Sequence, residues 1–96
     1  MAYDIVHSQS AEFDFGDIID YITVHLNNPT AASTLLDEYE DRLATIRQSP
    51  RVYRLAHVER LARKGYHTFD FGTYTAFYMI DYAEQKVLIL RIFYKK

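Results

Sequence analysis

The stretch Tyr66–Tyr94, YHTFDFGTYTAFYMIDYAEQKVLILRIFY, predicts three closely spaced β-strands near the carboxyl end of the chain. Aromatic and β-branched residues are concentrated in three runs, which are Tyr66–Phe71, Thr73–Asp81 and Val87–Tyr94. Such residues favour strands, while Gly72 and the polar segment Tyr82–Lys86 provide the turns between them. Because short turns join neighbouring strands in antiparallel order, this part of the chain predicts a mainly antiparallel sheet.

Two amphipathic helices are predicted before this sheet. The first begins after Ser8, a suitable N-cap residue, and runs to about Leu26. Its apolar stripe consists of Ala11, Phe15, Ile18, Ile19, Ile22 and Leu26. The second helix spans roughly Pro29 to Ser49, with a stripe of Ala32, Leu35, Leu36, Tyr39, Leu43 and Ile46. Since only a short Asn-rich loop separates the helices, they are expected to form an antiparallel hairpin.

The remaining segments complete a single-domain α+β fold. A short strand is predicted at Tyr3–His7, and Arg51–Lys64 is irregular, with a helical turn that Gly65 ends. Gly16 costs its helix about 1 kcal/mol relative to alanine and is interpreted as tolerated. The helical hairpin must bury its stripes on one face of the sheet, so residues 1–96 predict one two-layer βααβββ domain.

Composition narrows the possible functions. The chain has 96 residues and no cysteine, which excludes disulfides and thiolate metal sites. The four histidines show no close paired spacing, so neither a metal nor another cofactor is expected. No apolar run approaches the roughly 20 residues needed to span a bilayer, and no basic leader precedes an apolar run. The expectation is a cytoplasmic protein without membrane contact.

The charge is divided unevenly along the chain. Residues 1–50 hold nine acids against two arginines, a balance of −7, whereas residues 51–96 hold nine Lys or Arg against four acids, a balance of +5. The asymmetry can steer oppositely charged partners to different faces. Alternatively, the two halves compensate each other in three dimensions, and the sequence leaves both interpretations open.

A series of short motifs runs through nearly the whole chain, whereas no Walker loop, G-x-G-x-x-G, H-E-x-x-H or G-x-S-x-G sequence occurs. The motifs are Ser8-x-x-Ala11, Asp17-Ile18-Ile19-x-Tyr21-Ile22, Leu26-Asn27-Asn28-Pro29-x-Ala31-Ala32-x-x-Leu35-Leu36, Pro50, Gly65-Tyr66, Tyr74-x-x-Phe77-Tyr78 and Ile89-Leu90-Arg91-Ile92-x-Tyr94. In order and spacing they resemble the RelE/ParE toxins of bacterial type II toxin–antitoxin modules, which include plasmid-stabilisation systems. The resemblance implies the same fold and a toxin that is neutralised by the disordered segment of a cognate antitoxin protein.

Two activities are implied by this resemblance. RelE-like members enter the ribosome and cleave mRNA, which blocks translation, whereas ParE-like members inhibit DNA gyrase. The basic, aromatic carboxyl end favours the RelE-like activity, in which case the chain is an enzyme, a ribosome-dependent mRNA interferase. The alternatives are a ParE-like gyrase inhibitor and a degenerate, non-catalytic module that only binds antitoxin.

The resemblance also implies a set of site residues. Cleavage of RNA needs a base, an acid and a cation around the reacting phosphate. By position in the family motifs, the candidate catalytic residues are Arg91, Tyr94 and His67, the last of which stands where many members have arginine. In a regular strand Arg91 shares a face with Val87, Ile89 and Phe93, and Tyr94 points the other way. Arg91 could instead pair with an acid, for which Asp70 is a candidate.

Two further groups of residues are predicted to contact partners. The candidate nucleic-acid-binding residues are basic and lie in the irregular segment and at the carboxyl end, namely Lys95, Lys96, Arg51, Arg54, Arg63 and Lys64. The candidate antitoxin-binding residues are Phe13, Tyr21 and Val24, which lie off the apolar stripes. They widen the apolar surface of the first helix beyond what one sheet face can cover, so they are expected to line a groove for the antitoxin.

Overall fold

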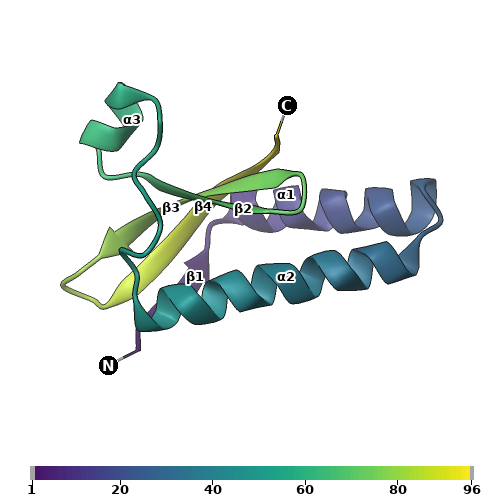
Figure 1. Cartoon of the computed structure of the whole chain (residues 1–96), viewed down its shortest axis with the longest axis horizontal. Helices are drawn as coiled ribbons and strands as arrows, with labels where there is room; N and C mark the ends of the chain where they lie inside the picture. The colour runs from purple at the N-terminus through teal and green to yellow at the C-terminus, as the bar shows by residue number, and fades with distance from the viewer. Residues whose placement is uncertain (1, 96) are drawn as a thin grey trace.

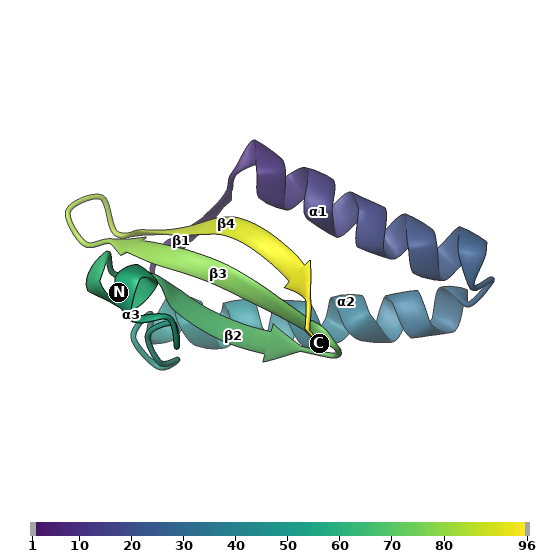
Figure 2. The same cartoon turned by 90° about the horizontal axis from the view of Figure 1, so that it is seen from above.

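The computed structural model describes residues 2–95 as two layers, in which a helical hairpin covers one face of a four-stranded sheet (Figure 1). The elements follow in the order β1 (Asp4–His7), α1 (Gln9–Asp20), η1 (Tyr21–His25), α2 (Pro29–Gln48), α3 (Glu59–Arg63), β2 (His67–Phe71), β3 (Tyr74–Asp81) and β4 (Lys86–Tyr94). This confirms the predicted α+β arrangement. The hairpin projects past one end of the sheet, and α3 stands on the opposite side of the sheet from α2 (Figures 1 and 2).

The sheet has the strand order β1-β4-β3-β2 and is mixed. The two hairpins β2–β3 and β3–β4 are antiparallel, whereas β1 pairs in parallel with β4. The parallel pair joins the two ends of the sequence, since Ile5 lies opposite Val87 and His7 opposite Ile89. The last strand therefore lies inside the sheet, between β1 and β3.

The core lies between the two layers. From the helices it takes Ala11, Ile22, Ala32, Leu35, Tyr39, Leu43 and Ile46, and from the sheet Phe69, Phe71, Ala76, Tyr78, Val87, Ile89 and Ile92. The ring of Tyr39 lies at its centre, with ring centroids 4.7 Å from Phe71 and 4.8 Å from Phe15. Leu36 departs from the prediction, because its side chain is 41% exposed on a side of α2 that borders Phe15 and Gly16 rather than the sheet.

The helix ends follow the capping residues. The Ser8 hydroxyl accepts a hydrogen bond from the Ala11 N–H at 3.0 Å, and the Asn28 side chain accepts one from Ala31 at 3.1 Å. The first helix differs from the prediction in its last turn, since its hydrogen bonding becomes π-helical in η1. Asn27, at a φ of 48°, then turns the chain into α2. The first helix therefore ends in a π-helical turn and a left-handed residue rather than in a regular α-helical turn.

A β-bulge in β4 decides which side chains face the core. Phe77 pairs with Arg91 but the next residue, Tyr78, pairs with Ile89, so Leu90 is an extra residue in its strand. One extra residue reverses the alternation of side chains beyond it. Val87 and Ile89 are fully buried, and Arg91 is exposed on the other face of the sheet. The expectation that these three residues share a face is therefore wrong.

Candidate functional site on the sheet and its carboxyl edge

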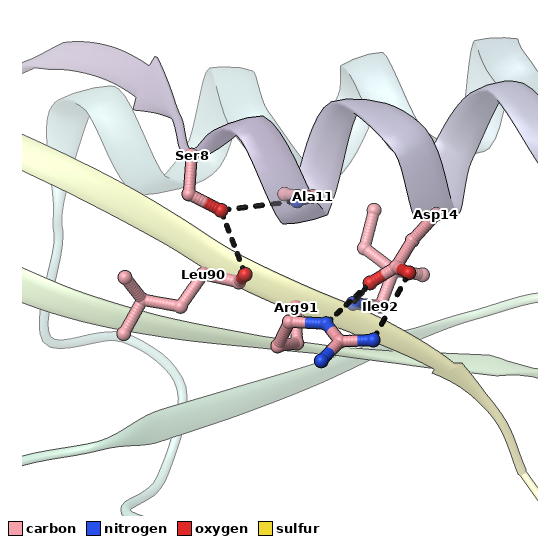
Figure 3. A network of polar contacts seen from close by, with 6 residues as sticks. All are labelled: Ser8, Ala11, Asp14, Leu90, Arg91 and Ile92. Carbon is pink, nitrogen blue, oxygen red and sulfur yellow. Dashed lines mark hydrogen bonds and ion pairs between the residues drawn. The ribbon is translucent and has the colours of Figure 1, made fainter.

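Arg91 is held by a side chain of the first helix, in the part of β4 that β1 leaves unpaired (Figure 3). The pairing of β1 with β4 ends at Ile89, and the start of α1 takes over the edge beyond it. There the Ser8 hydroxyl donates to the Leu90 carbonyl at 2.8 Å. Six residues further along the chain, the Asp14 carboxylate accepts hydrogen bonds from Arg91 Nε at 2.8 Å, from Arg91 Nη2 at 3.2 Å and from the Ile92 N–H at 2.9 Å.

These contacts shift the pKa values of both Asp14 and Arg91. The hydrogen bond from Arg91 is the main reason that the pKa of Asp14 lies below its ordinary value; burial opposes it in part, and the hydrogen bond from the Ile92 N–H adds a smaller effect in the lowering direction. In turn, the Asp14 carboxylate raises the pKa of Arg91. The partner of Arg91 is thus Asp14 and not Asp70, which instead contacts Lys95 Nζ at 3.1 Å.

Tyr94 lies on the other face of the sheet from Arg91. Its ring packs edge-on against Tyr74, with 5.7 Å between the centroids. Together with Ile18, Tyr21 and Leu35, the two rings line an open cleft between the hairpin and the end of the sheet. Arg91 borders a different hollow on the other face, so the side chains of Arg91 and Tyr94 do not converge.

His67 lies at the far end of the sheet from Tyr94. The His67 Nδ1 atom is 2.8 Å from the Tyr53 carbonyl oxygen and, because a carbonyl can only accept, its N–H donates a hydrogen bond to that oxygen. The ring stacks on buried Tyr78, with centroids 5.1 Å apart. Arg91, Tyr94 and His67 therefore occupy three separate places, and their catalytic roles stay a prediction from the resemblance.

The predicted basic residues fall into two places. Arg51, Arg54, Arg63 and Lys64 line one hollow near His67, at the start of β2. Lys95 borders a second hollow with Arg54, next to Asp70. Lys96 lies outside the described residues. The structure thus gathers the basic residues of the irregular segment, whereas Lys95 stands apart from Arg63 and Lys64; contact with a nucleic acid is untested.

The sequence-based search missed a pair of adjoining hollows on the outer sheet face, the face that the hairpin leaves uncovered. The first has a volume of about 220 Å³ and is lined by Leu61, Tyr66, Phe77, Leu90, Arg91 and Phe93. The second, of about 580 Å³, includes Arg54, His57, Thr68, Asp70, Thr75 and Lys95, and it meets the first at Phe77. Apolar residues at successive positions of β3 were the available signal, but Phe93 could not be assigned to this face without the bulge.

The candidate antitoxin-binding residues are exposed. Phe13 is 66% exposed, Tyr21 51% and Val24 69%. Tyr21 stacks on His25 with centroids 5.6 Å apart. Such exposure is what binding a partner requires, and the role itself stays a prediction.

Residues 2–95 contain neither a metal-ligand cluster nor a helix suited to span a membrane. No cluster of three or more His, Asp or Glu side chains in this part of the chain could hold a metal ion. Likewise, none of the helices described here combines the length and the apolar character that crossing a membrane demands.

Comparison with family models identifies the family to which the chain belongs. A family model described as the ParE toxin of the type II toxin–antitoxin system, parDE, matches residues 5–96. The protein therefore belongs to the ParE family of type II toxin–antitoxin toxins, within the RelE/ParE group. The comparison with curated proteins found no match.

Three solved structures share the fold. The chromosomal ParDE toxin–antitoxin system of P. aeruginosa gives a TM-score of 0.76 at 18% identity, covering 99% of this chain and 98% of that one. The RelBE2 toxin–antitoxin complex of Mycobacterium tuberculosis gives 0.67 at 21% identity, covering 99% and 100%. A mutant of E. coli toxin RelE in the free state gives 0.68 at 15% identity, covering 99% and 84%. At these identities the likeness shows the fold alone.

Proposed function

We propose that this toxin arrests growth by inhibiting DNA gyrase, as ParE-like members of its family do, and that a cognate antitoxin protein neutralises it. The observation that carries the proposal is that the three candidate catalytic residues do not converge. Arg91 forms an ion pair with Asp14, Tyr94 lies on the other face of the sheet, and His67 lies at the far end of the sheet from Tyr94. This reverses the preference for mRNA cleavage that the carboxyl-terminal residues suggested.

The physical reason lies in what RNA cleavage demands. A general base and a general acid must each lie within about 3 Å of the atoms between which the proton moves, and a cation must face the charge that develops on the phosphate. Here the guanidinium of Arg91 already donates a hydrogen bond to the Asp14 carboxylate, and the phenol of Tyr94 borders a cleft on the opposite face of the sheet. A toxin that acts by binding a protein needs no such convergence.

The antitoxin part of the proposal has separate support. The family is defined by toxin–antitoxin pairs, and two of the similar structures belong to toxin–antitoxin systems. The exposed side chains of Phe13, Tyr21 and Val24 give the helical layer an apolar surface for such a partner.

Two assays on the purified protein test the proposed activity. We expect it to inhibit supercoiling of relaxed plasmid by DNA gyrase and to leave mRNA intact in a translating extract. Truncated messages at ribosomes, reduced at least ten-fold by Arg91→Ala or Tyr94→Phe, together with unaffected supercoiling, would establish the RelE-like activity instead. Normal growth of cells that express the chain without antitoxin would favour a non-toxic binding module.

A further inference from the structure

We infer that the outer sheet face around Phe77 is the surface with which the toxin grips its protein target, and that it accepts an acidic segment carrying a large apolar side chain. The inference rests on the proposed function, because it concerns a protein target other than the antitoxin. It separates the two partners in space, with the antitoxin on the helical layer and the target on the opposite face of the sheet.

The apolar hollow provides an anchor site. Leu61 of α3 and the side chains of Tyr66, Phe77 and Phe93 surround a space of about 220 Å³. A cavity of about 150 Å³ with apolar walls already admits benzene, so this hollow has room for a leucine or phenylalanine side chain. Phe93 is 46% exposed and meets Phe77 edge-on at 5.9 Å. Exposed aromatic residues around a pocket are typical of the energetic centre of a protein interface.

Charged side chains around this hollow select an acidic partner. Arg54 borders the adjoining hollow and Arg60 lies next to Leu61 in α3, and both are exposed, whereas Arg63 and Lys64 line the separate hollow near His67. The acids of the same region are Glu59, in the first turn of α3, and Asp70. The Asp70 carboxylate accepts a hydrogen bond from Thr75 Oγ1 at 2.8 Å and forms an ion pair with Lys95. An apolar centre with a charged rim is the usual anatomy of a transient interface, and charge complementarity fixes its partner and speeds its encounter.

A polypeptide fits this face better than RNA does. The two cations that the strand β4 and its end place there, Arg91 and Lys95, are already neutralised by Asp14 and Asp70. Phosphates would have to compete with both carboxylates, whereas an apolar anchor needs neither cation. The Arg91 guanidinium lies 4.8 Å from the centroid of Phe93, so Asp14 also fixes one wall of the hollow.

The test compares two double variants of the full chain. Phe93→Ser with Arg54→Glu alters the outer sheet face, and Leu36→Ser with Asp37→Lys makes matched changes on the exposed side of α2. We expect the first to restore growth of cells without antitoxin, to raise the concentration for half-inhibition of gyrase at least ten-fold and to bind antitoxin as the wild type does. The α2 variant should arrest growth and inhibit gyrase like the wild type.

The outcomes distinguish failure of the surface from failure of the proposed function. Growth arrest by the outer-face variant at wild-type strength would overturn the inference, even if gyrase is inhibited. If the wild type leaves gyrase unaffected, the proposed function fails, and restored growth with intact antitoxin binding still supports the surface. If the wild type cleaves mRNA and the outer-face variant does not, RNA is the ligand of this face, and the inference is overturned. Arg54→Glu alone, on an exposed loop, serves if the double variant does not fold, and Arg54→Lys should retain activity.

Discussion

At the scale of single residues, Asp14 joins the helical layer to β4 beyond the end of β1. Since its folded-state pKa is held below the ordinary value of 3.8, its contribution to stability is present above that pH and is lost as the pH falls through the lower folded-state value. We expect Asp14→Asn to lower the urea midpoint at pH 7 and to weaken the loss of stability below pH 3.8. Urea unfolding from pH 7 to pH 2.5 measures both effects. Asp37→Asn, at an exposed position of α2, is the control, and equal acid sensitivity in Asp14→Asn and the wild type would contradict the prediction.

His7 provides a second prediction at this scale, and its ionised form is a cation, whereas that of Asp14 is an anion. Its Nε2 atom is 2.7 Å from the buried Tyr39 hydroxyl. Burial lowers the pKa of His7 from 6.5, with a smaller contribution from Arg47, while Glu12 and Glu40 act in the raising direction. The unfolded state therefore binds the proton more readily, and the free energy of unfolding should fall as the pH drops below about 6.5.

Replacing each member of this pair separates burial from hydrogen bonding. His7→Asn should remove the fall in stability between pH 6.5 and 5. Tyr39→Phe should cost about 1 kcal/mol through the lost hydrogen bond but keep the fall, because burial of the imidazole is its main cause. Urea unfolding of both variants across this range decides the matter, and a fall that persists in His7→Asn would show that another group titrates there.

At the scale of the elements, periodicity and capping residues predict every helix and strand to within a few residues, except where hydrogen bonding changes locally. Ser8, Asn28 and Gly65 fix helix ends through contacts with neighbours in sequence, so their roles can be predicted from the sequence. The bulge at Leu90 depends on pairing between β3 and β4, and nothing in the sequence of β4 alone indicates it. That single residue is why the facing of Arg91 was predicted wrongly.

Gly16 tests the helix α1 as an element. A Cβ atom placed there meets no other heavy atom within 4 Å, so the structure gives no steric need for glycine. Gly16→Ala should therefore stabilise the protein by about 0.5–1 kcal/mol through the helix propensity of alanine. Gly72→Ala is the contrast, because its φ is +57° and its Cβ would lie 2.6 Å from Leu35 Cδ1, and it should destabilise the protein. Thermal unfolding compares the two, and a lower melting temperature for Gly16→Ala would contradict the prediction.

At the scale of the whole molecule, the first half of the sequence forms the helical layer and one strand of the sheet, and the second half forms the other three strands. Residues 1–50, with their excess of acids, form the helical layer and β1, whereas residues 51–95 form α3 and the rest of the sheet. The sequence left open whether the opposite charges mix, because that depends on how the layers pack. Likewise, the basic hollow near His67 follows from residues close in sequence, but the outer sheet face unites α3 with β3 and β4 and required the tertiary structure.

The helical layer yields the last prediction, which concerns the antitoxin. Phe13 and Val24 are 66% and 69% exposed, so their replacement by serine should change the stability of the toxin by less than about 0.5 kcal/mol. Covering an exposed apolar side chain of this size contributes at least about 1.5 kcal/mol, so Phe13→Ser with Val24→Ser should weaken antitoxin binding about 100-fold while growth arrest persists. Titration of the antitoxin against the toxin, with Leu36→Ser as the control, measures the change. Wild-type affinity in the double variant would move the antitoxin site away from α1 and η1, and would leave the apolar surface of that layer without a partner.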